Sequence, residues 1–319
     1  MKLKTRYEEI VDVAKIATIG QAKPFGEILA LAAKEKLNPA VKDAERNLLI
    51  GIDIQNDFME GGSLAVPGSK GDVERLTKWI YENMNGITDI MCSIDTHYPH
   101  QIFHPAMWED ANGNNPDPFI VVTYDDVVRG DWRVVAGVPQ RVLECLQVLQ
   151  ATGRDDRKGV QIWPYHCLIG TEGWALEQQF ANIVHFHSYA KKSKPQFVFK
   201  GTDNYSEMFG IIEPEYNPEG FVNFQVLNAI AGEDEQGIFR VNYDRIFIAG
   251  EAKSHCLLES VLQILKRFAN RPEVTQRITV LEDCSSPIPG CEQATENAFD
   301  GLKKTYGIQV KKSTEVQLV

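Results

Sequence analysis

The sequence predicts an α/β protein in three layers, with helices on both faces of a mostly parallel sheet. Short apolar runs of the kind that parallel sheets bury on both faces alternate along the chain with longer segments of helical periodicity. The 319 residues are 43% apolar and 24% charged, which is the balance of an ordinary globular protein with a large core. Such sheets bind ligands at the carboxyl ends of their strands, so the residues after each strand are the first candidates for function.

Six apolar runs are the expected strands, and several of them end in an acidic residue or a glycine. They are residues 48–53, 89–95, 182–187, 195–200, 245–250 and 277–283. Between them, apolar residues recur at steps of three and four, which predicts helices. The expected helices are residues 72–85, 172–182, 255–268 and 292–304.

Three segments do not follow this alternation. Residues 1–46 have a helical pattern that is interrupted at Pro24, and we expect a helical N-terminal extension there. Residues from about 105 to 160, with a helix over 139–152, and residues from about 211 to 243 are expected to be insertions in loops. A length of 319 residues suggests two domains at ~150 residues each. We instead expect one domain over 47–319, because every candidate functional residue lies outside these additions.

Charge and cysteine content exclude several classes of protein. A net charge of −11 disfavours broad binding to nucleic acid or to an anionic membrane surface.

No apolar run approaches the ~20 residues of a membrane span, and the charged N-terminus lacks the features of a signal peptide, so a cytoplasmic location is expected. Six cysteines without a Cys-x-x-Cys pair indicate neither a disulfide scaffold nor a zinc ribbon. A homo-oligomer is compatible with the sequence.

Cys256 is the candidate nucleophile among these cysteines. It ends the stretch GEAKSHC (250–256), where a strand is expected to turn into a helix. The unpaired N–H groups of a helix N-terminus lower the pKa of a thiol and can hold an oxyanion. Asp53 and Lys200 also follow strands, so they could face the same crevice as a base and a charge partner. Taken alone, Cys256 could be a buried structural thiol, Asp53 a helix cap and Lys200 a solvated charge. Because all three are expected at the same edge of the sheet, a catalytic role is favoured.

A second group of residues suggests a metal site. Asp95 and His97 lie two positions apart at a strand end, so they face the same side, and His166 adds a second imidazole. One carboxylate and two imidazoles with open positions suit zinc, iron or manganese. The alternative is that His166 is a hydrogen-bonded core histidine and that His100 and His104 are loop residues.

Five motifs together resemble the isochorismatase-like cysteine hydrolases, and among them the nicotinamidases. They are DIQNDFMEGGSLAVPG at 53–68, DTH at 95–97, WPYHC at 163–167, KGTDNYS at 200–206 and GEAKSHC at 250–256. One such motif is weak evidence, but five in the family order, each at an expected strand end, are specific. The resemblance covers about 47–104, 161–210 and 244–310, and implies the isochorismatase-like form of the three-layer fold.

The resemblance implies a role for each matching residue. Cys256 is the nucleophile, Asp53 the general base and acid, and Lys200 the residue that orients and charges this pair. The implied metal ligands are Asp95, His97 and His166, with His104 or His100 as a further candidate. The implied cofactor is one divalent ion that holds the pyridine nitrogen of the substrate, with zinc favoured over iron or manganese.

The substrate pocket is implied in the same way. Phe58 and Trp163 match the aromatic walls of the ring pocket. The backbone N–H groups of Ala252 and Cys256 match the oxyanion hole, and the Glu251–Ala252 bond matches a cis peptide.

The implied activity is the hydrolysis of nicotinamide to nicotinate and ammonia through a cysteine thioester, a reaction of NAD salvage and pyridine nucleotide metabolism. The partner is then a small-molecule amide. A first alternative is another amide or carbamoyl hydrolase of the same superfamily, since the insertion at about 105–160 could cover or reshape the pocket. A second is a binding protein that has kept the fold and lost activity, which the joint presence of Asp53, Lys200 and Cys256 disfavours.

Overall fold

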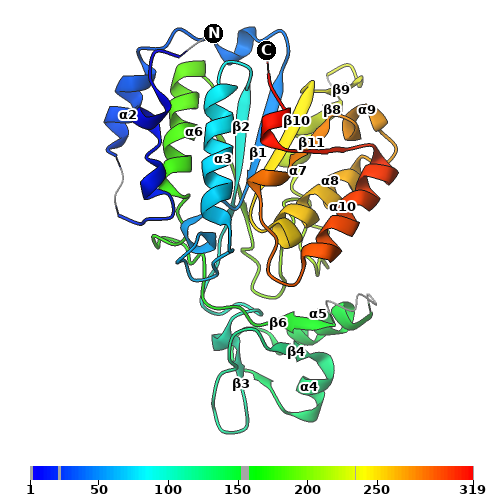
Figure 1. Cartoon of the computed structure of the whole chain (residues 1–319). Coiled ribbons are helices and arrows are strands. Elements are labelled where there is room, and N and C mark those ends of the chain that lie inside the picture. The colour runs from blue at the N-terminus through cyan, green and yellow to red at the C-terminus, as the bar shows by residue number, and fades with distance from the viewer. Residues whose placement is uncertain (1–2, 21–22, 152–157, 234, 319) are drawn as a thin grey trace.

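A six-stranded parallel sheet forms the centre of the protein (Figure 1). The computed structural model describes residues 3–20, 23–151, 158–233 and 235–318. The strands lie in the order β12-β11-β10-β1-β2-β7, and every neighbouring pair is parallel. Their bounds are β1 (Asn47–Ile52), β2 (Asp89–Asp95), β7 (Gln196–Lys200), β10 (Arg245–Gly250), β11 (Ile278–Leu281) and β12 (Gln309–Lys311). Five of the six expected strands are confirmed, and β12 is an edge strand whose polar sequence did not predict it.

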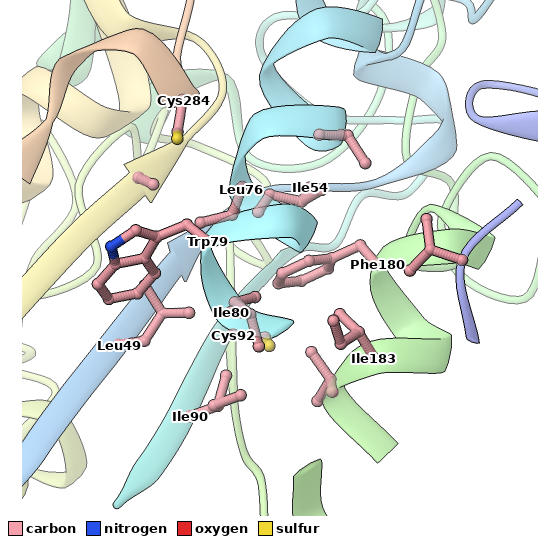
Figure 2. Packing of buried hydrophobic residues seen from close by; sticks show 14 of the residues in the cluster. Leu49, Ile54, Leu76, Trp79, Ile80, Ile90, Cys92, Phe180, Ile183 and Cys284 are labelled. Carbon is pink, nitrogen blue, oxygen red and sulfur yellow. The ribbon is translucent and has the colours of Figure 1, made fainter. Parts of the chain in front are cut away.

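Helices cover both faces of this sheet (Figure 1). The first face carries α1 (Tyr7–Ile10), α2 (Phe25–Ala32), α3 (Ser69–Glu82) and α6 (Gln178–Lys191). The second carries α7 (Phe224–Ile230), α8 (Leu258–Arg267), α9 (Pro272–Thr275) and α10 (Glu292–Tyr306). Strand β1 shows why both faces are covered, because Leu49 packs into the first core and Leu48 and Ile50 pack into the second. Figure 2 shows Leu49 beside Trp79 in the first core.

The strand expected at 182–187 is wrong, because these residues lie inside helix α6. The helix expected over 172–182 begins only at Gln178, after the N-cap Glu177 accepts a hydrogen bond from the backbone N–H of Phe180. Helix α6 is buried on nearly all sides, since it lies between the sheet and α2. A helix that is buried all round loses its polar face, and its sequence then resembles the continuous apolar run of a buried strand.

The N-terminal extension is less helical than expected. Besides α1 and α2 it contains only the 3₁₀ turns Val13–Lys15 and Ala40–Lys42 among its described residues. These residues are nevertheless packed against the sheet and its helices, because Tyr7, Ile10, Ile16 and Ile28 belong to the first core. Further short helical turns lie at Asn56–Phe58, Pro105–Met107, Lys253–Leu257, Glu282–Cys284 and Ser313–Glu315.

The segment after β2 folds around a core of its own, beyond one end of the main sheet (Figure 1). It contains β3 (Trp108–Glu109), β4 (Val121–Thr123), α4 (Tyr124–Arg129), β5 (Arg133–Val134), α5 (Pro139–Ala151) and β6 (Gly159–Gln161). The helix expected over 139–152 is confirmed as α5, and Thr152 lies outside the described residues. The two ends of the segment lie side by side, because the Trp163 N–H donates to the Phe103 carbonyl at 2.8 Å.

The second expected insertion, 211–243, contains α7 and a hairpin of β8 (Ala231–Glu233) and β9 (Phe239–Val241). The helix expected over 255–268 is divided into the π-helical turn Lys253–Leu257 and α8, and the one over 292–304 is α10. Among the described residues, no helix combines the length and the apolar character that crossing a membrane requires.

Candidate active site at the carboxyl edge of the sheet

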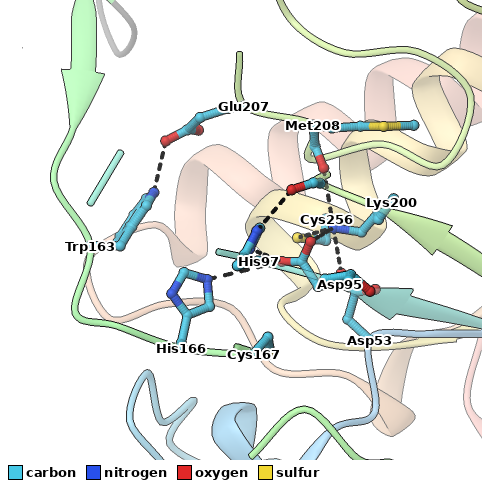
Figure 3. Close-up of polar contacts among 12 residues, drawn as sticks. Asp53, Asp95, His97, Trp163, His166, Cys167, Lys200, Glu207, Met208 and Cys256 are labelled. Carbon is cyan, nitrogen blue, oxygen red and sulfur yellow. Dashed lines mark hydrogen bonds and ion pairs between the residues drawn. The ribbon is translucent and has the colours of Figure 1, made fainter. Parts of the chain in front are cut away.

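The carboxyl ends of four adjacent strands bring the three expected catalytic residues together with Asp95, an expected metal ligand. Asp53 follows β1, Asp95 ends β2, Lys200 ends β7 and Cys256 follows β10. Strand register accounts for part of this convergence, because Asp95 and Lys200 are direct partners in the β2–β7 ladder. Figure 3 shows Lys200 between the two carboxylates, with Cys256 beside it.

The Lys200 ammonium is the centre of this group. Its Nζ lies 2.9 Å from Asp53 Oδ2 and 3.0 Å from Asp95 Oδ1, and the lysine is only 1% exposed. It also donates to the Met208 carbonyl at 3.1 Å and lies 3.7 Å from Cys256 Sγ. Burial favours the neutral amine, but the two carboxylates outweigh it and hold the pKa of Lys200 well above its usual value. The site therefore contains a permanent positive charge beside the thiol.

Asp53 is held by a residue that sequence reasoning missed. The Ser93 hydroxyl donates to Asp53 Oδ1 at 2.5 Å and accepts the Asp53 backbone N–H at 2.9 Å. Ser93, the one polar residue between the two aspartates that bound strand 89–95, was the available signal for this contact. Asp53 has a φ of 46°, a left-handed conformation that is uncommon for a non-glycine residue and often marks a functional position. Burial raises the pKa of the Asp53 carboxyl, with Lys200 opposing the rise.

The expected lowering of the Cys256 pKa is wrong. Burial raises the pKa of this thiol well above its ordinary value, and Lys200 opposes the rise only in part. The helix N-terminus could be anticipated from the sequence, but the desolvation of the sulfur could not. Cys256 is therefore a neutral thiol at rest, and it needs a base to remove its proton. Asp53 is the carboxyl group that lies within hydrogen-bonding reach of the Cys256 thiol.

Asp95, His97 and His166 lie together, with ligand atoms that are all within 4.8 Å of one another. His97 Nδ1 lies 3.0 Å from the Gly201 carbonyl and His166 Nδ1 lies 2.8 Å from the Pro164 carbonyl. A carbonyl can only accept, so each Nδ1 carries a proton, and each Nε2 of a neutral ring keeps a lone pair. His97 Nε2 is 2.9 Å from Asp95 Oδ2, so a proton or a metal ion must separate these two acceptors. The donor set thus fits a divalent ion.

The two remaining histidine candidates differ. His104 is fully buried with its Nδ1 at 2.9 Å from the Tyr98 carbonyl, and its Nε2 has no hydrogen-bond partner within the described chain. Its ring lies 5.7 Å from those of His97 and His166, outside the three-residue cluster. Burial lowers the pKa of His104 to about 4, so the ring is neutral at pH 7. His100 is exposed on the loop after β2.

A cavity of about 440 Å³ opens over these groups. Three of the residues expected in the substrate pocket, Phe58, Trp163 and Ala252, line it, as do Asp95, His97, His166, Lys200 and Cys256. The Trp163 indole is fixed by donating to Glu207 Oε1 at 2.8 Å, and the Phe58 ring packs edge-on against His166 at 5.6 Å. The Glu251–Ala252 peptide bond is cis, as the resemblance implied.

The cavity also contains residues that the sequence did not point to. Phe119 and Gln161 come from the segment 105–160 and its edge, Glu207 comes from the loop after β7, and His255 comes from the π-helical turn after β10. Phe119, Gln161 and Glu207 lie outside the five motifs, and His255 lies inside GEAKSHC, where no role was expected for it. Their placement depends on how the loops pack over the sheet edge.

A second buried pair of carboxyl groups lies behind Ala252. The Glu251 and Asp72 side chains share a hydrogen bond, and both are at most 2% exposed. Two carboxyl groups can share a hydrogen bond only if one of them is protonated. Arg75 pairs with Asp72 Oδ1 at 2.7 Å, which favours the proton on Glu251. Burial, with Asp72 adding to it, raises the pKa of Glu251 well above its usual value.

Comparisons with known proteins identify similar structures but no sequence relatives. No protein-family model matches this chain, and no curated protein matches it. A nicotinamidase/pyrazinamidase from Acinetobacter baumanii superposes with a TM-score of 0.54 at 15% identity, covering 86% of this chain and 99% of its own. The yeast nicotinamidase bound to the inhibitor nicotinaldehyde gives 0.54 at 19% identity, covering 83% and 99%. A protein from L. infantum in complex with nicotinate gives 0.50 at 15% identity, covering 88% and 97%. At these identities the likeness confirms the three-layer, isochorismatase-like fold.

Proposed function

We propose that this chain is an amidohydrolase that converts nicotinamide to nicotinate and ammonia through a thioester on Cys256. The observation that carries this proposal is the buried group of Asp53, Lys200 and Cys256, joined through one ammonium at the floor of a cavity. A thiol, a carboxylate base and a fixed positive charge are the groups that thiol-based acyl transfer needs. We assign the reaction to one domain over 47–319, with 1–46 as an extension.

The reaction follows from the protonation states. Asp53 takes the thiol proton while Lys200 stabilises the thiolate, and the sulfur attacks the carboxamide carbon. The oxygen of the tetrahedral intermediate accepts hydrogen bonds from the backbone N–H groups of Ala252 and Cys256. Asp53 returns its proton to the leaving nitrogen, which departs as ammonia and leaves an acyl thioester. A water molecule that loses its proton to Asp53 attacks this thioester, and the acid and the thiol are released.

A divalent ion would be held by Asp95, His97 and His166, with His104 as a fourth candidate, and zinc is favoured over iron or manganese. When bound, it would supply a Lewis-acid contact for the ring nitrogen of the substrate. The chain itself contributes the orientation of the ligands, since the Gly201 and Pro164 carbonyls fix both imidazoles. Phe58 and Trp163 would hold the ring between apolar walls and exclude water from it.

Structural neighbours support this substrate. Two of them are described as nicotinamidases, one with bound nicotinaldehyde, and a third holds nicotinate. A second candidate function is the hydrolysis of another amide or carbamoyl compound, which the presence of Phe119 and Gln161 in the cavity favours. A binding protein without activity is disfavoured, because it is costly to bury a carboxyl group and an ammonium beside a thiol, and Asp53, Lys200 and Cys256 together are the set that thioester chemistry uses.

Ammonia release from nicotinamide tests the proposal. Cys256→Ala should lower the rate on the order of 10⁴-fold or more. Cys145→Ala is the matched control, because Cys145 is also buried but lies in helix α5 of the insertion, and its rate should equal that of the wild type. Unchanged activity of Cys256→Ala would refute the thioester. Ammonia from another amide but not from nicotinamide would move the assignment to the second candidate function.

A further inference from the structure

The cavity is larger than the substrate of the proposed reaction requires. An apolar protein cavity of about 150 Å³ accommodates one benzene ring. The cavity over Cys256 measures about 440 Å³, so it can hold a pyridine ring with its carboxamide and still leave room for a second ring. This volume lies within the range of sites that take larger organic ligands, roughly 300–1,000 Å³.

Most of the cavity lining that is exposed to solvent is apolar. The inner end of the cavity carries the buried polar groups Asp95, Lys200 and Cys256. Its exposed lining residues are Ser63, Ala65, Pro67, Phe119 and Pro289, of which only the serine is polar, and its half-buried lining includes Leu64, Ile288 and Gln161. A substituent that reaches this region would therefore meet carbon surface on several sides, which favours an uncharged, apolar group.

Phe119 is the most unusual residue of this exposed lining. It is 60% exposed although it is a large aromatic residue, and its φ of 74° lies in the left-handed region. A bulky residue in this conformation is a genuine outlier, and such outliers concentrate at binding sites. The conformation is maintained from both sides, because the Phe119 N–H donates to the Ile162 carbonyl at 2.5 Å and the Ile162 N–H donates to the Ile120 carbonyl at 2.8 Å.

The Phe119 ring continues the aromatic wall of the inner pocket. It lies edge-on to Trp163, with ring centroids 6.2 Å apart. Trp163 in turn lies 6.2 Å from the His255 ring, next to Cys256, and its indole is fixed by Glu207. One row of rings thus leads from the reacting cysteine to the rim, and the segment 105–160 supplies its last member.

We propose that Phe119 and Trp163, with Leu64, Ile288 and Pro289, form an outer subsite for an aryl substituent on the substrate ring. The substrate class is then a heteroaromatic carboxamide that carries a second, uncharged ring. This inference rests on the proposed amide hydrolysis at Cys256, and it adds what the insertion contributes to substrate choice.

Matched substrates test the subsite. The kcat/KM for ammonia release is measured with nicotinamide, 5-phenylnicotinamide and 5-benzylnicotinamide. The wild type should prefer at least one extended amide by roughly 10–100-fold, the range expected for burying a further ring. Phe119→Ala should lower this preference about tenfold. Phe119→Gly should do the same with an intact fold, since glycine adopts the φ of 74° without strain.

Phe221→Ala is the control. Phe221 is 51% exposed, lies in the segment 211–243 and is not among the residues that line the cavity, so its removal should leave the preference unchanged. No preference for either extended amide in the wild type, or a preference that survives Phe119→Ala, would overturn the subsite.

A binding measurement separates this inference from the proposed function. Calorimetry with the Cys256→Ala protein compares the affinity for nicotinamide with that for 5-phenylnicotinamide and 5-benzylnicotinamide, with and without Phe119→Ala. If the wild type releases no ammonia from any of these amides, the proposed function fails. Tighter binding of an extended amide that depends on Phe119 would still support the subsite, and equal binding of all three would overturn it.

Discussion

Replacing Lys200 with methionine should destabilise the protein and remove its activity together. Methionine keeps the apolar stem but deletes the ammonium that lies 2.9 Å from Asp53 and 3.0 Å from Asp95. Both carboxylates are buried, so each would lose its cation without gaining water. Breaking a buried ion pair by removing one partner costs about 3–5 kcal/mol, out of a typical total of roughly 5–15 kcal/mol.

The chain offers a matched control in Lys191, its other fully buried lysine among the described residues. Lys191 is the last residue of α6, and its Nζ pairs with Asp43 Oδ1 at 2.7 Å and donates to the Asn85 carbonyl at 2.8 Å. Asp43 and Asn85 precede β1 and β2, so this group lies at the amino end of the sheet, opposite the carboxyl edge that carries the cavity. Lys191→Met should lose a comparable free energy of unfolding, about 3–5 kcal/mol. Because it removes no group from the cavity, it should keep its rate per folded molecule.

Urea unfolding followed by circular dichroism gives the free energy of each variant, and ammonia release gives the rate under conditions where both are folded. The loss for Lys200→Met should be smaller at pH 5 than at pH 8, because carboxyl groups without their cation take up protons more readily as the pH falls. A Lys200→Met protein as stable as the wild type would refute the energetic reasoning. Equal loss of rate in both variants would show that the catalytic effect is a general consequence of destabilisation.

Three further predictions concern protons and metal. Burial raises the pKa of Glu177 to about 7 from an unfolded value near 4.5, so the folded state binds the extra proton and stability falls as the pH rises between these values, by about 3 kcal/mol in total. Glu177→Gln should remove this slope in urea midpoints measured from pH 4.5 to 8. Glu251→Gln mimics the protonated partner of Asp72, so in the same urea series its stability relative to the wild type should increase as the pH rises from about 4.5, the ordinary pKa of a glutamate, and a constant difference would contradict the shared proton. Asp95→Asn should lower the affinity for a divalent metal by more than the roughly 10–100-fold that is typical of residues that only orient metal ligands. Elemental analysis measures the bound metal, and a content equal to the wild type's would contradict the ligand assignment.

The central sheet could be predicted because its strands are buried on both faces. Strands β1, β2 and β10 carry continuous apolar runs that end in an acid or a glycine, and this pattern is specific enough to give their bounds within a residue. Helix α6 was misassigned for the same physical reason, since burial against both the sheet and α2 gives a helix the apolar continuity of a strand. A continuous apolar run therefore predicts that a segment is buried more reliably than it predicts whether the segment is a strand or a helix.

Some features of the candidate site could be predicted from the sequence, and others could not. The convergence of Asp53, Lys200 and Cys256 could be predicted, because parallel strands place their carboxyl ends at one edge. The raised pKa of Cys256 could not, because it depends on how much water the surrounding loops exclude. The contribution of Phe119 could not be predicted either, since it depends on how a segment with its own core packs over the edge of another.

The two ends of the segment 105–160 lie side by side, and this has an evolutionary consequence. Its ends meet where the Trp163 N–H bonds the Phe103 carbonyl, so the chain leaves and re-enters the domain at nearly one point. The entropy of closing a loop grows only with the logarithm of its length, about 0.6 kcal/mol for each doubling. The segment could therefore lengthen, shorten or be exchanged at little thermodynamic cost, while the strands that hold Asp53, Lys200 and Cys256 stay unchanged. Selection could then alter which amide is accepted without altering how it is cleaved.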